Sequence, residues 1–286
     1  MRPIILSTLH GYGRADLARD VVAGVTVAMV ALPLSLAIAI ASGAPPATGL
    51  VTAIIGGFMI SLLGGSKVQI GGPTGAFIVV VFSVIAIHGY DGLVIATLMA
   101  GLILLAAGWL RVGSLIEYIP EAVINGFTIG IAIIIATSQL GDFLGLDTGK
   151  VPADFLEKIP VLWAARDTLS VPSVVVALAT LVLIVALRRA FPRFPGLIVA
   201  VGLTSAAVAL TDAPVDTIAS RFGALPDRLP MPALPDISLD RIVALIPSAL
   251  LIAFLAGVES LLSAMVADRM TGERHRPNAE VLAQGW

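Results

Sequence analysis

Cysteine is absent from this 286-residue chain, and charged and aromatic residues are scarce. The lack of cysteine excludes disulfide bonds, thiolate metal sites and thiol catalysis. Charged residues make up 13% of the chain, whereas soluble domains carry about 25%. The net charge of −2, without a dense basic cluster, argues against a nucleic-acid partner. The chain also lacks a Walker motif, a dinucleotide-binding fingerprint, zinc-ligand spacing and a nucleophile elbow, so we do not expect an enzyme.

Hydrophobic residues are abundant instead, at 58% of the sequence, and the mean hydropathy is +1.01. A helix needs about 20 apolar residues to cross a bilayer, and runs of that kind recur along the chain. We therefore predict an all-α polytopic membrane protein. The spans are expected at about 21–42, 47–63, 74–87, 93–110, 123–140, 171–187, 196–210 and 242–267. Residues 151–165 are expected to form an amphipathic helix on the membrane surface.

The basic residues predict how these spans are oriented. Residues 1–20 contain only the short apolar run Ile4-Ile5-Leu6, which is no signal peptide. Eleven of the 17 Lys and Arg residues fall on the same side as the N-terminus, and the other six are confined to two long loops. Because positive residues concentrate on the cytoplasmic side, we predict that the segment 1–20 is cytoplasmic.

A glycine-rich stretch, Ile70-Gly71-Gly72-Pro73-Thr74-Gly75-Ala76-Phe77, interrupts the apolar pattern. The helix counted from Thr74 has about 14 residues and a length of roughly 21 Å, which is too short to cross a bilayer. It is expected to begin inside the membrane, after a short extended segment at residues 68–70. Its free N–H groups and positive dipole end suit an anion. The alternative is a bent span, since Gly and Pro are common in membrane helices.

Glu259 is the one acidic residue inside an expected span, and Ser263 follows it by one helical turn. A carboxylate at that depth is costly and therefore a functional candidate. It can be protonated or bind a cation, so we predict H⁺ or Na⁺ coupling, with Na⁺ at Glu259 and Ser263 as one option. The alternative is a structural carboxylate paired with a basic residue, although no basic residue falls inside a span.

Other polar or helix-breaking residues in the spans are interpreted more simply. Pro33 lies mid-span near Ser35, and alone it favours an ordinary kink. It becomes a site residue if the first and third helices are neighbours, because proline frees a carbonyl. Ser138 and Gln139 are interpreted as interhelical hydrogen-bonding groups.

Several of these segments resemble the SulP (SLC26) family of anion transporters, and the resemblance covers nearly the whole chain. Pro33 with residues 44–50 resembles the first-to-second helix signature, and residues 64–77 resemble the third-helix motif. The remaining matches are residues 116–120 and 126–127 at the start of the fifth helix, 138–140 at its end, 257–264 and 268–272 at the eighth helix, and 278–285 at the ninth.

The resemblance implies a 7+7 SLC26/UraA-like fold of two inverted seven-segment repeats followed by a STAS domain, with a short strand before half-helix three. Residues 21–267 would form helices one to eight, and residues 268–286 a cytoplasmic loop and the start of helix nine. The chain is then expected to be truncated, without the rest of the second repeat and the STAS domain. The full-length protein is expected to be a homodimer in the bacterial inner membrane.

The resemblance also implies site residues. The anion would lie between half-helices three and ten and move in an elevator-type mechanism. It would contact Pro33, Ser35, Gly72, Thr74, Gly75, Ala76 and Phe77, and Glu259 with Ser263 would bind the coupling cation. No catalytic residue and no cofactor besides H⁺ or Na⁺ is expected.

The substrate is left open among small anions. Leu34 and Ile38 stand where many members carry Gln and an aromatic residue, a departure from plain sulfate specificity. We therefore predict secondary active transport of sulfate, bicarbonate or a C4-dicarboxylate. The alternatives are an uncoupled anion channel and a nucleobase or organic-anion carrier of the same architecture. An intramembrane enzyme would need a nucleophile–base pair, and only Glu259 titrates inside the membrane.

Overall fold

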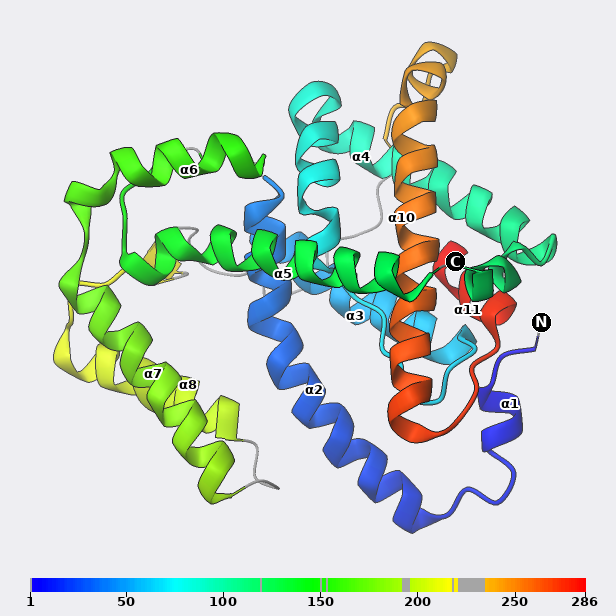
Figure 1. Ribbon diagram of the computed structural model, residues 1–286, viewed down its shortest axis with the longest axis horizontal. Helices are drawn as coiled ribbons and strands as arrows, with labels where there is room; N and C mark the ends of the chain where they lie inside the picture. The colour runs from blue at the N-terminus through cyan, green and yellow to red at the C-terminus, as the bar shows by residue number, and fades with distance from the viewer. Residues whose placement is uncertain are drawn as a thin grey trace.

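The computed structural model describes residues 2–118, 120–149, 151–152, 154–191, 196–217, 219–220 and 235–286. All regular structure in these ranges is helical (Figure 1), which confirms the all-α prediction. Five of the described helices are long and apolar enough to cross a membrane: α2 (Arg14–Ala41), α3 (Pro46–Leu63), the helix Gly75–Trp109, α7 (Val171–Ala190) and α10 (Leu239–Thr271). Shorter apolar stretches belong to α5 (Glu121–Leu144) and α8 (Gly196–Thr211).

The ends of these helices follow local sequence signals. The Asp16 carboxylate accepts a hydrogen bond from the Gly13 N–H at the start of α2, at 3.0 Å. Pro46 occupies the first turn of α3, where its missing N–H costs nothing. Ser238 caps α10 by accepting from the Arg241 N–H, and Gly272 ends the same helix at φ +73°.

Helix α4 (Ile78–Trp109) consists of two helices joined at a kink. Gly89 has φ 72° and ψ 178°, a conformation that lies outside the helical region and that glycine adopts readily. A 3₁₀ turn, η1 (Gly75–Phe77), precedes the first of the two helices. The break therefore separates the predicted short third helix from the fourth span, as the sequence indicates.

The predicted strand at residues 68–70 is wrong. No strand is formed within the described ranges, because a strand needs a hydrogen-bonded neighbour and no described segment pairs with this one. Residues 64–74, which we call the connection, instead run irregularly from the end of α3 to η1.

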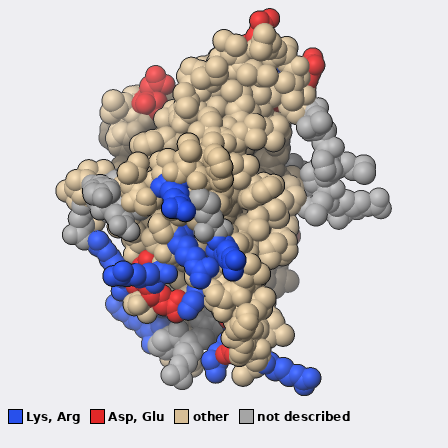
Figure 2. Space-filling view, turned by 90° about the vertical axis from the view of Figure 1, so that its right-hand side faces the viewer, with Lys and Arg blue, Asp and Glu red and all other residues tan. Residues whose placement is uncertain are grey.

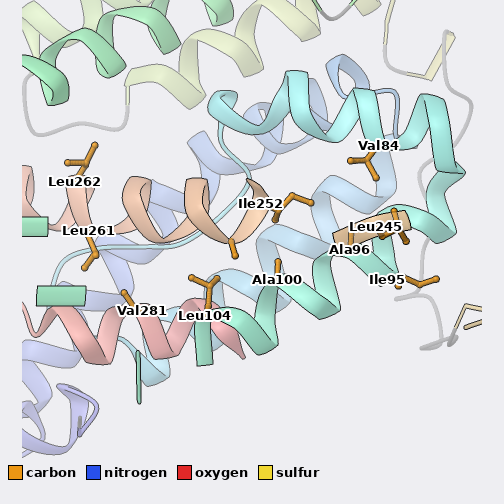
Figure 3. Packing of buried hydrophobic residues seen from close by; sticks show 11 residues of the cluster. Val84, Ile95, Ala96, Ala100, Leu104, Leu245, Ile252, Leu261, Leu262 and Val281 are labelled. Atoms are coloured by element: carbon orange, nitrogen blue, oxygen red, sulfur yellow. The ribbon is translucent and has the colours of Figure 1, made fainter. Parts of the chain in front are cut away.

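The apolar core lies where α4 packs against α10 and α11 (Pro277–Gly285). Figure 3 shows most of its buried side chains in the space between these three helices. Small residues bring α11 close to α4, since a Cβ on Gly101 would lie 2.9 Å from the carbonyl oxygen of Gly285. We call α2, α3, α4, α10 and α11 the core bundle.

The helices α5, α6 (Phe155–Ala164), α7 and α8 form a second region, the arm. Helices α7 and α8 pack against each other, and α5 extends from α7 to η1 in the core bundle (Figure 1). The amphipathic helix predicted at 151–165 is present as α6, with Leu162 buried and Leu156 and Trp163 exposed. Its position on a membrane surface stays a prediction.

Charged side chains are unevenly distributed on the surface. Figure 2 shows a broad uncharged area, with Lys and Arg side chains gathered over its lower half. In Figure 1 this lower end carries the start of α2, the end of α10 and α1 (Ile5–Thr8). An uncharged band bounded by charge is the surface that a bilayer requires. Which side faces the cytoplasm stays a prediction.

Candidate functional site

The site predicted at the start of the short third helix is built around Thr74. Thr74 has extended backbone angles, φ −129° and ψ 156°, and its side chain makes no capping hydrogen bond. Gly75 behind it is buried, whereas Gly72 is exposed. The first N–H groups of a helix have no intrahelical partner, so this backbone presents donors and the positive end of the helix dipole to the adjoining space.

Three buried polar atoms near the place where the connection meets α10 have no hydrogen-bond partner among the described residues. They are Gln69 Oε1, Thr74 Oγ1 and Glu259 Oε2. The Thr74 hydroxyl and the Glu259 carboxyl lie within electrostatic reach of each other. Leaving such an atom unsatisfied costs about 1–3 kcal/mol. An arrangement of this kind indicates a ligand, a water or a missing neighbour.

A cavity of about 240 Å³ lies between α2, α4 and α5, next to the same helix start. Its lining is mostly apolar, and Ser138 and Gln139 of α5 supply its two polar side chains; the other lining residues are Pro33, Leu34, Ala37, Ile38, Ile78 and Ile135. Ser138 and Gln139, interpreted from the sequence as interhelical hydrogen-bonding groups, thus also line a cavity. Their role depends on where α5 passes η1, which no local pattern in the sequence reveals.

The remaining predicted site residues are placed differently. Ser35 is 2% exposed, and it packs against α3, where a Cβ on Gly49 would lie 2.2 Å from its carbonyl oxygen. The Phe77 side chain packs against the apolar core, and its backbone N–H donates to the Thr74 carbonyl oxygen at 3.3 Å. Ala76 is half-buried, and Ser263 is exposed. Of the predicted coupling pair, Glu259 is the one near Thr74.

A second carboxylate, Glu280 of α11, was not identified as a site candidate from the sequence. It is 1% exposed. Its Oε1 accepts a hydrogen bond from Ser260 Oγ at 3.0 Å, and its Oε2 accepts from the Gly65 N–H at 2.8 Å. The available signal was its position in the first turn of a helix that begins at Pro277.

Two amide side chains complete this group around Ser260. Gln69 Nε2 donates to the Ser260 carbonyl oxygen at 3.0 Å and to its Oγ at 3.1 Å. Gln284 Nε2 also donates to Ser260 Oγ, at 3.0 Å. We call Gly65, Gln69, Ser260, Glu280 and Gln284 the Glu280 network.

Comparison with known proteins places this geometry in a family. The sulfate permease family model matches residues 17–286. The chain is 42% identical over 277 residues to the putative sulfate transporter YvdB of Bacillus subtilis, covering 96% of this chain and 52% of YvdB. It is 31% identical to the bicarbonate transporter BicA of Picosynechococcus sp., covering 93% of this chain and 48% of BicA.

A solved structure agrees with the sequence relatives. The transmembrane domain of a cyanobacterial bicarbonate transporter BicA superposes with a TM-score of 0.78 and 31% identity, over 92% of this chain and 68% of that one. The chain spans about half the length of the curated relatives it matches. By the family match, the sequence relatives and the fold, the chain belongs to the sulfate permease (SulP/SLC26) family.

Proposed function

We propose that this chain forms one side of the anion site of a secondary active transporter. The observation that carries the proposal is the helix start at Thr74, which faces Glu259 with buried polar atoms left unpartnered on both. The anion would accept hydrogen bonds from the backbone N–H groups of Gly75 and Ala76 and from the Thr74 hydroxyl. Gly72 and Pro33 would line its approach. Partial charges bind an anion less tightly than a full positive charge would, which permits release on the far side.

The substrate that we propose is a small anion, either sulfate, bicarbonate or a C4-dicarboxylate. The relatives include a putative sulfate transporter and a bicarbonate transporter. The neighbouring cavity adds only Ser138 and Gln139 as polar side chains to an apolar lining. Neutral hydrogen-bonding groups of this kind suit any of the three anions.

We attribute coupling to the repulsion between the bound anion and the nearby Glu259 carboxylate. An anion bound at Thr74 would lie near the Glu259 carboxylate, and two adjacent negative charges disfavour each other. Anion binding would therefore favour protonation of Glu259 or occupation by Na⁺, and the coupling is reciprocal. Ser263, one helical turn further on, would add a hydroxyl oxygen for the cation.

The proposed motion is of the elevator type, with the core bundle moving as one body against the arm. The two regions meet at the cavity between α2, α4 and α5, so such a motion would change access to the site. The protein would act as a homodimer in the bacterial inner membrane with its N-terminus in the cytoplasm.

Uptake of labelled sulfate, bicarbonate and succinate into proteoliposomes tests the proposal, with and without H⁺ or Na⁺ gradients. We expect gradient-driven uptake of at least one anion and its loss by more than about tenfold in Glu259→Gln, because the amide cannot change charge. Glu157→Gln, at an exposed carboxylate of α6, is the matched control. Uptake that no gradient drives would favour an uncoupled channel instead, and full coupling in Glu259→Gln would refute the role of that residue.

A further inference from the structure

The connection carries the proposed anion site, yet no strand pairing holds it in place. Its first residues are instead fixed by contacts with other segments, among them an exposed ion pair between Lys67 Nζ and the Glu273 carboxylate at 2.8 Å. The Gly64 carbonyl accepts from the Ile4 N–H at 3.0 Å, and the Gly65 carbonyl accepts from the Arg276 N–H at 2.9 Å. The Gly65 N–H donates to Glu280. The connection is thus attached at its start to the N-terminal segment and to α11.

We propose that Glu280 and Ser260 are positioning residues that hold the connection, and with it the anion site, against α10. This inference rests on the proposed function. The hydrogen bonds form a closed ring that runs from Gly65 to Glu280, on to Ser260 and Gln69, and back along the chain to residue 65. A closed ring fixes the segment 65–69 more firmly than any one of its bonds.

Ser260 is the centre of this ring, and its hydroxyl has no unused capacity. A serine hydroxyl has one donor hydrogen and two acceptor lone pairs. Here the hydrogen is donated to Glu280, and the lone pairs accept from Gln69 and Gln284. The group is 5% exposed, so water cannot replace a lost partner without a rearrangement.

The ring also connects the two sides of the proposed site. Ser260 follows Glu259 directly in α10, and Gln69 precedes Thr74 by five residues in the connection. A change at Glu280 therefore reaches Thr74 through Gln69 and reaches Glu259 through Ser260. Glu280 touches neither the anion nor the cation, so its effect would be indirect.

Local geometry explains why a glutamate and two glycines occupy these positions. Glu280 lies in the first turn of α11, where the helix dipole stabilises a negative group. A Cβ on Gly64 would lie 3.1 Å from Glu280 Oε2, and a Cβ on Gly65 would lie 2.2 Å from the Arg276 carbonyl oxygen. The backbone approaches the carboxylate this closely only because both residues lack side chains.

The variants Glu280→Gln and Ser260→Ala test the positioning role with little change in volume. The glutamine amide would place a donor opposite either the Ser260 hydroxyl or the Gly65 N–H, so one hydrogen bond is lost. We expect the KM for the anion to rise about tenfold, with kcat falling less than about threefold. The double variant should be no worse than the more damaging single variant, because both break one network. Glu157→Gln, at an exposed carboxylate of α6 in the arm, should leave KM unchanged.

A second measurement does not depend on transport. The chain contains no cysteine, and a Cβ at Gly72 would have no atom within 4 Å, so Gly72→Cys provides a single labelling site on the connection. We expect maleimide to modify it several-fold faster in the Glu280→Gln and Ser260→Ala backgrounds than in Glu157→Gln.

The outcomes separate the two proposals. Lower thermal stability and kcat, with unchanged KM and unchanged labelling at position 72, would reduce Glu280 to a structural role and overturn the inference. If the parent protein transports none of the anions tested, the proposed function fails, while the labelling rates still decide whether Glu280 positions the connection.

Discussion

The core bundle and the arm are built from similarly apolar helices but are held together differently. In the most apolar part of the helix Gly75–Trp109, 33% of the residues are buried within this chain, against 0% in α7. Within the core bundle, α4, α10 and α11 therefore gain stability from packing inside the chain. In α7, no residue of this part is fully buried, and the exposed apolar side chains face outward, where lipid would be as favourable an environment as another helix.

The two regions also treat buried polar groups differently. In the core bundle, Glu280 and Ser260 are hydrogen-bonded to several partners. In the arm, burial lowers the pKa of the Lys158 ammonium below its ordinary value, and the nearby Asp154 carboxylate opposes this shift in part. The comparison teaches that the core bundle satisfies its buried polar groups with internal hydrogen bonds, whereas the arm holds a buried ammonium whose charged form is disfavoured.

The largest expected effect comes from matched Leu→Ala changes in the two regions. Leu245 in the core is 1% exposed, whereas Leu181 in α7 is 51% exposed. We expect Leu245→Ala to cost about 2–5 kcal/mol through loss of contacts and a residual cavity. Leu181→Ala should change the free energy of unfolding by less than about 0.5 kcal/mol. Thermal unfolding in detergent would measure both, and equal losses would break the comparison.

Smaller effects on the free energy of unfolding, opposite in sign in the two regions, are expected from matched Gly→Ala changes. An alanine Cβ at Gly101 would lie 2.9 Å from the Gly285 carbonyl oxygen, whereas one at Gly130 in α5 would meet nothing within 4 Å. Gly101→Ala should destabilise the protein by about 1–3 kcal/mol, because α11 is pushed away from α4. Gly130→Ala should stabilise it by up to about 1 kcal/mol, since alanine loses less entropy in a helix. The same unfolding assay applies, and a stable Gly101→Ala protein would show that the α4–α11 contact is loose.

The sequence predicted most of the fold because membrane spans are a local property. Apolar run length located the helices, and Gly89 with its neighbours marked the break in α4. The short strand failed because strand pairing depends on a distant segment, and the irregular connection is held by contacts with α1, α10 and α11 instead.

The residues of the candidate site also fall into those that a local sequence pattern identifies and those that depend on distant contacts. Thr74 and Glu259 stood out locally, the first because its helix is too short and the second because a carboxylate interrupts an apolar run. The structure brings the two together. Glu280 and Gln139 could not be identified in this way, because the Glu280 bond to Gly65 spans 215 residues and Gln139 joins a cavity formed with α2 and α4.

The smallest expected effect concerns Lys158, the buried ammonium group of the arm. Because the pKa of Lys158 is lowered in the folded protein, the unfolded chain binds more protons between that value and about 10.4. Stability should therefore rise with pH through this window, and the gain is absent below it. Lys158→Met should remove the slope and raise the melting temperature near neutral pH by about 1–3 °C. Melting curves from about pH 7 to pH 10 would measure this, with the exposed Lys67→Met as control. A melting temperature that falls in Lys158→Met would mean that the ammonium contributes a favourable interaction to the arm, as buried polar groups do in the core bundle.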